Sequence, residues 1–147
     1  MSSTSVRPDA GRAALVAEAL LWLTVARLLL SMLPFRKVAA LLGLEESRLP
    51  SPSRPVDPAT LAAVGWVIPA LARHLPWSST CLVRALAGAR LLSRRDVPVT
   101  LHLGARSAGN GTLLAHAWLS AGGRILLGER DAAGCHLLAT FETAPAT

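Results

Sequence analysis

The first third of the chain is patterned as apolar helix. From Ala13 to Leu33 almost every residue is a strong helix former, and Pro34 ends the run. A shorter helix is expected from Val38 to Leu44. Residues 1–11 are polar and serine-rich, which is typical of a disordered tail, so we assign the N-terminal apolar helical region to residues 12–49.

A proline-rich segment at residues 50–58 predicts a linker before the rest of the chain. Asp57 can cap a helix whose first position is Pro58, a residue favoured there because its missing N–H is not needed. We expect this helix to run to about His74, with a kink or a break at Pro69.

The next predicted helix begins beside a cysteine. Residues 75–80 indicate a loop, and an apolar stripe then favours a helix from Cys81 to Ser93. Ser79 and Thr80 are both suitable N-caps, so the Cys81 thiol is placed in the first helical turn.

Beyond Arg95 the pattern changes to strands separated by turn residues, which indicates an antiparallel meander. Helices that precede a sheet predict an α+β fold, with the N-terminal helices packed on a small antiparallel sheet and a core at residues 58–147. The predicted strands are residues 99–105, 112–121, 124–129 and 135–141.

Composition shows that the chain is unusually apolar for one domain of 147 residues. Hydrophobic residues make up 52% and charged residues 16%, so some apolar surface should face a partner or a membrane. The first helix is long enough to span a bilayer, but Glu18 and Arg27 would then lie in hydrocarbon. We therefore expect it to pack on protein, and the basic segment after it leaves membrane-surface association through residues 13–37 open.

The net charge of +6 does not indicate a nucleic-acid partner, because the arginines are scattered and no aromatic side chains interleave with them. Two cysteines cannot form a disulfide framework, and no secretory signal is evident, so a reducing cytoplasm is expected. The cysteines and histidines do not fall at a zinc spacing. We expect neither a metal nor a cofactor.

Cys81 and His116 are the candidate catalytic pair. A helix N-terminus favours a thiolate, and the same N–H groups can stabilise an oxyanion. His116 lies inside an apolar strand, where an imidazole is either a core residue or held for chemistry. Cys135 follows no comparable feature and is interpreted as structural, as is His102, for which no partner is evident.

A carboxylate can be placed beside His116 by counting along a hairpin. If Gly122-Gly123 is a two-residue turn, regular pairing sets His116 opposite Glu129, which could orient the imidazole. Asp131 would lie on the same face one step further. A shift of one residue in register would turn Glu129 away, so a solvent-facing carboxylate stays open.

Residues 77–141 resemble the lasso-peptide leader peptidases, which are transglutaminase-like, papain-like cysteine proteases. The resemblance lies in WSSTCLVRALAGARLLSRR at 77–95, VTLHLGA at 99–105, and AHAWL at 115–119 followed by GGRILLGE. It implies that Cys81 and His116 belong to a Cys-His-acid triad that cleaves the leader from a ribosomally made precursor peptide. The family's acid often falls where this chain has Gly128, and Asp96 stands where the family usually has glycine.

The resemblance also implies partners. The chain looks like the stand-alone peptidase half of the family, which works with a separate leader-recognition protein and supplies a lasso cyclase with its substrate. Two alternatives stay open: an acyltransferase that passes the acyl group to an amine, and a catalytically idle scaffold in which Cys81 is merely packed.

Overall fold

The computed structural model describes residues 8–47, 56–75 and 80–143, and within these ranges the chain is a layer of helices on one five-stranded antiparallel sheet. The α+β prediction is confirmed. The helices are α1 (Pro8–Met32), α2 (Phe35–Leu41), α3 (Pro58–Ala72), α4 (Cys81–Ser93) and α5 (Glu129–Ala132). The strands are β1 (Leu44–Ser47), β2 (Thr100–Ser107), β3 (Leu113–Ala121), β4 (Arg124–Leu127) and β5 (His136–Thr143), in the spatial order β1-β5-β2-β3-β4.

The N-terminal boundaries differ from those predicted. Helix α1 already begins at Pro8, so residues 8–11 are helical rather than part of a tail, because proline is favoured in a first helical turn. Helix α2 begins and ends three residues earlier than expected, and Leu44 instead starts β1. That strand was not predicted because its sequence, LEES, carries no apolar alternation; its pairing with β5 defines it.

Helices α3 and α4 begin at the predicted residues. The Asp57 carboxylate accepts a hydrogen bond from the Ala59 N–H at 3.1 Å, which confirms the cap. Helix α3 continues through Pro69 to Ala72 without splitting, although Pro69 has no N–H to donate to the preceding turn. The first part of the predicted linker, residues 50–55, and the loop residues 76–79 lie outside the described residues.

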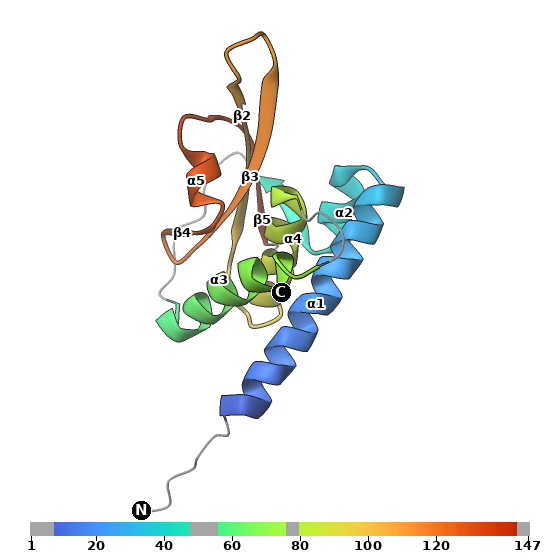
Figure 1. Cartoon of the computed structure of the whole chain (residues 1–147), viewed down its shortest axis with the longest axis vertical. Coiled ribbons are helices and arrows are strands. Elements are labelled where there is room, and N and C mark those ends of the chain that lie inside the picture. The colour runs from blue at the N-terminus through green and yellow to red at the C-terminus, as the bar shows by residue number, and fades with distance from the viewer. Residues whose placement is uncertain (1–7, 48–55, 76–79, 144–147) are drawn as a thin grey trace, which may run out of the picture.

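One hydrophobic cluster joins the helices to the sheet. Its fully buried side chains include Leu23 of α1, Ile68 of α3, Leu86 of α4 and Leu119 of β3. Figure 1 shows α1 along one side of the molecule, with its N-terminal end projecting away from the other helices, while the β2–β3 hairpin projects at the opposite end. The N-terminal helices therefore contribute side chains to the same hydrophobic core as α3, α4 and the sheet.

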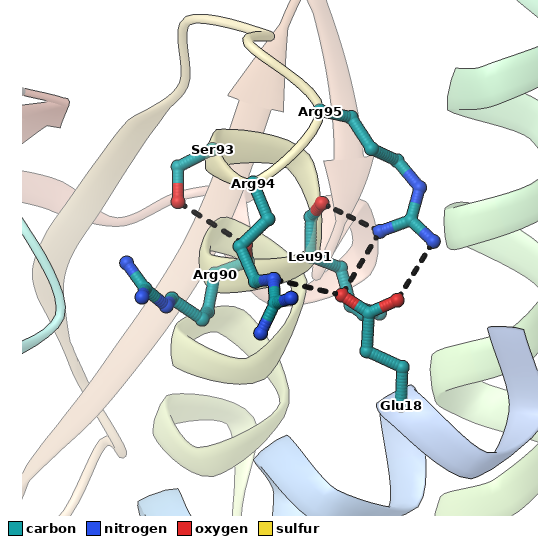
Figure 2. Close-up of polar contacts among 6 residues, drawn as sticks. All are labelled: Glu18, Arg90, Leu91, Ser93, Arg94 and Arg95. Atoms are coloured by element: carbon teal, nitrogen blue, oxygen red, sulfur yellow. Dashed lines mark hydrogen bonds and ion pairs between the residues drawn. The ribbon is translucent and has the colours of Figure 1, made fainter. Parts of the chain in front are cut away.

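An ion-pair cluster fixes α1 to the end of α4. The Glu18 carboxylate receives hydrogen bonds from the Arg95 guanidinium at 2.8 and 3.2 Å and lies 3.4 Å from Nε of Arg94 (Figure 2). Arg90, one turn earlier, stacks its guanidinium 4.9 Å from the ring centre of Trp22 on α1. Glu18 thus lies against protein.

Candidate active site

Cys81 is the first residue of α4, as predicted. Thr80 precedes it in an extended conformation, and the Thr80 Oγ1 atom accepts a hydrogen bond from the Val83 N–H at 3.2 Å. Thr80 is therefore a cap of this helix; Ser79 lies outside the described residues. The Cys81 side chain is half-buried and packs against the hydrophobic cluster. Cys81 thus lies in the first helical turn, where backbone N–H groups have no partner within the helix.

The side of α4 that carries Cys81 faces the sheet. Gly88, two turns later on the same side, approaches the sheet so closely that a Cβ atom there would meet Leu127 Cδ1 at 2.7 Å and Leu119 Cδ2 at 3.1 Å. The C-terminal end of α4 leads through a short loop to Thr100, which pairs with Ser120.

His116 lies on β3, directly opposite Gly104 of β2. Its side chain is half-buried, and its Nε2 atom is buried. Strand alternation puts His116 on the same sheet face as Trp118, whereas Leu119, on the other face, is the side chain that meets α4. Helix α4 therefore packs on β3, but on the sheet face opposite the one that strand alternation gives to the His116 side chain. The packing of these elements does not by itself bring the thiol and the imidazole together, and their pairing stays a prediction.

The hairpin after β3 has the predicted turn but not the predicted register. Ala121 pairs with Arg124 across the two glycines, as expected. The pairing then shifts by one residue, so that Leu119 faces Leu127, because a bulge leaves Leu126 without a partner in the ladder. Strand β4 ends at Leu127.

The expected pairing of His116 with Glu129 is therefore wrong. Glu129 is not in a strand but begins the short helix α5, and its side chain is exposed. A catalytic role for Glu129 no longer has the support of strand register and stays a prediction. Asp131 lies in the same helix, two residues on.

Gly128 has a backbone that excludes a side chain. Its φ is +81°, and a Cβ atom there would lie 2.8 Å from the Ala117 carbonyl oxygen and 3.0 Å from Trp118 Cβ. A carboxylate at this position would require the backbone to move. Glycine is therefore required where the chain leaves β4 and lies against β3. An acidic residue of the site would have to come from another position.

His102 has a partner that the sequence did not reveal. Its Nε2 atom lies 2.8 Å from Oγ of Ser120, and its ring stacks on that of Trp118 with centroids 5.4 Å apart. Burial lowers the pKa of His102 below its ordinary value, against a smaller opposing effect of the Glu142 carboxylate. The prediction of no partner is wrong, while these contacts fit a packed, neutral imidazole.

Gly104, directly opposite His116, has a role that the sequence pattern did not predict. A Cβ atom at Gly104 would lie 2.7 Å from the Trp118 ring, so the glycine makes room for the indole to lie across β2. A glycine inside an apolar strand is the signal that could have indicated this close approach. Trp118 and Gly104 thus set the surface around the candidate histidine.

Cys135 and the two other histidines have no assigned role in this region, although the His136 carbonyl oxygen lies close to Gly104. The Cys135 N–H donates to the Ala132 carbonyl oxygen at 3.2 Å, just before β5 begins. His74 and His136 have exposed side chains. Within residues 8–47, 56–75 and 80–143, no group of three His, Cys, Asp or Glu side chains is arranged to hold a metal ion.

Comparison with known proteins gives one match. Residues 20–138, most of the chain, match the model of the family described as the transglutaminase-like superfamily. The match includes α4 with Cys81 and β3 with His116, and it extends into α1. No curated protein matches the chain, and no solved structure does.

Proposed function

Because the chain belongs to the transglutaminase-like superfamily, whose members are cysteine proteases and acyltransferases, we propose that it is a cysteine peptidase that removes the leader from a lasso-peptide precursor. The observation that carries this proposal is the position of Cys81 at the capped start of α4 within the matched family region. The motifs around Cys81 and His116 support the leader-peptidase assignment within the superfamily.

The chemistry follows from the first turn of α4. The Cys81 thiolate attacks the scissile carbonyl, and His116 holds the thiol proton and later gives it to the leaving amine. Thr80 accepts from the N–H of Val83 and, through its carbonyl oxygen, from that of Arg84. The N–H groups of Cys81 and Leu82 are therefore the first-turn donors we assign to the oxyanion. Water then hydrolyses the thioester.

The acid that orients His116 is proposed to come from α5. Glu129 is the first choice and Asp131 the alternative, since both are carried by the helix that packs on β3. We further propose that a separate recognition protein presents the leader, and that a lasso cyclase takes the released core peptide. The proposed site of action is the cytoplasm, where a free thiol stays reduced.

The proposal is tested by incubating the chain with a precursor peptide and a leader-recognition protein and measuring products by mass spectrometry. We expect two fragments whose summed mass exceeds that of the precursor by one water. The Cys81→Ala variant should cleave at least about 1,000-fold more slowly, as expected for loss of a nucleophile. Cys135→Ala is the matched control and should cleave like the wild type. Equal cleavage by Cys81→Ala would overturn the assignment.

An acyltransferase is the second candidate, because the superfamily includes such enzymes and both reactions share the acyl-enzyme. The same spectra separate the two. A product whose mass has increased by that of an added amine, rather than by that of water, would identify transfer.

A further inference from the structure

Helix α1 has two apolar sides, and only one of them is covered by the protein. Ala19, Leu23 and Ala26 are at most 1% exposed and face the core. On the opposite side, Leu21, Leu28 and Met32 are 52%, 56% and 75% exposed. Leu28 and Met32 follow Leu21 by seven and eleven residues, which is about two and three helical turns, so the three side chains form one row along the helix. We call this row the α1 stripe.

The α1 stripe belongs to a helix that stays on the protein. Residues Gly11–Met32 are long and apolar enough to cross a membrane. Crossing, however, would remove the inner side chains from the core and pull Glu18 away from Arg94 and Arg95, to which it is bound at 3.4 and 2.8 Å. An uncompensated carboxylate in hydrocarbon is costly, so the helix is better suited to lie along a surface than to cross it.

The exposed charged side chains of α1 between residues 11 and 32 are those of Arg12 and Arg27, and both are positive. Glu18 is the only acidic residue between residues 11 and 32, and it is held on the protein side of the helix. Arg27 of α1 and Lys37 of α2 are exposed, and Lys37 is followed one turn later by Leu41, which is 63% exposed. Exposed leucines beside lysine and arginine match an anionic lipid surface, in which apolar side chains enter the acyl region and cations meet the headgroups.

We propose that the α1 stripe docks this protein on the surface of an anionic lipid bilayer, with α1 lying in the plane of the membrane. The ion pairs with Glu18 keep the catalytic core attached to the docked helix. The proposal does not depend on the chemistry of Cys81.

Sedimentation with vesicles tests the proposal on the full chain. Vesicles of phosphatidylglycerol and phosphatidylcholine in equal parts are compared with vesicles of phosphatidylcholine alone. We expect the wild type to sediment with the anionic vesicles, and the triple variant Leu21→Gln, Leu28→Gln, Met32→Gln to bind at least about tenfold more weakly. The variant Arg27→Gln, Lys37→Gln should lose binding to anionic vesicles and part of its sensitivity to salt.

The matched control changes exposed leucines elsewhere. Leu113, Leu137 and Leu138 are 72%, 56% and 69% exposed on β3 and β5, and their replacement by glutamine should leave vesicle binding unchanged. Circular dichroism checks that each variant is folded. The proposal is overturned if folded wild type stays in the supernatant, if the control variant loses as much binding as the stripe variant, or if light scattering shows a dimer that the stripe substitutions separate. Cys81→Ala should bind like the wild type, so a failed peptidase assignment is distinguishable from a failed docking surface.

Discussion

At the scale of single residues, glycines and their close neighbours shape the region around His116. Gly104 leaves space for the Trp118 ring, and Gly128 allows the backbone after β4 to lie close to the Ala117 carbonyl oxygen. Neither residue carries chemistry, yet a Cβ atom at either position would displace what surrounds the candidate histidine. The sequence suggests Cys81 and His116 because thiols and imidazoles are common catalytic groups, and their catalytic role stays a prediction. The need for glycine at position 104 depends on Trp118 of a neighbouring strand and leaves little trace in the local sequence.

His102 supplies the pH dependence expected at this scale. Burial lowers its pKa in the folded chain, so the folded state binds a proton less readily than the unfolded state does. The contribution of this residue to stability is therefore full above the ordinary pKa of 6.5 and is lost as the pH falls below that value through the lower pKa of the folded state. When the pH is lowered from 8 to 5, the melting temperature of His102→Gln should fall less than that of the wild type.

Glutamine is the suitable replacement because its amide can keep a hydrogen bond to Ser120. The comparison uses the difference between the two proteins, so titration of the other histidines cancels. Parallel loss of melting temperature in both proteins would mean that His102 is not the group responsible.

At the scale of elements, α4 is fixed at both ends. Thr80 caps its start, and at its end the Val97 N–H donates to the Leu92 carbonyl oxygen at 3.0 Å while the Asp96 N–H donates to that of Ser93 at 3.1 Å. This is a Schellman arrangement, with Asp96 at φ +57° in the left-handed position. Glycine would adopt that conformation without strain, whereas the Cβ atom of aspartate makes it less favourable.

Replacing Asp96 with glycine and with alanine should therefore change the free energy of unfolding in opposite directions. Asp96→Gly relieves the left-handed strain and should raise the free energy of unfolding by about 0.5–1 kcal/mol. Asp96→Ala keeps a Cβ atom and loses the polar side chain that tolerates this conformation, so it should lower the value by about 1 kcal/mol. Urea unfolding measures both. A glycine variant less stable than the wild type would contradict the strain assigned to this turn.

The elements also show where prediction from sequence succeeds. Helices α3 and α4 start at the predicted residues because caps and prolines act locally. The strand β1 and the bulge in β4 depend on pairing with other strands, which no local pattern records. The expected pairing of Glu129 with His116 was wrong for this reason, because the unpaired Leu126 shifts the register of all later residues by one.

At the scale of the whole molecule, the fold joins segments that the sequence suggests are separate. Helix α1 lies far from α4 in the chain, yet Glu18 and the core residues hold the two together. The fold class could be predicted because it follows from the order of periodic segments. The outward α1 stripe could not, since a helix that is apolar on most of its surface does not reveal which side the protein covers.

The most direct test of the central claim is whether the folded molecule activates Cys81. Cys81 and Cys135 are both half-buried, so exposure alone predicts similar reactivity and makes Cys135 an internal standard. Iodoacetamide labelling at pH 7 is followed by peptide mass spectrometry in the native chain, in His116→Ala and in urea. We predict that native Cys81 reacts at least about tenfold faster than Cys135, that His116→Ala removes most of this advantage, and that urea removes the rest. Equal rates of the two thiols in the native chain would contradict a catalytic Cys81 and favour a packed cysteine in an idle fold.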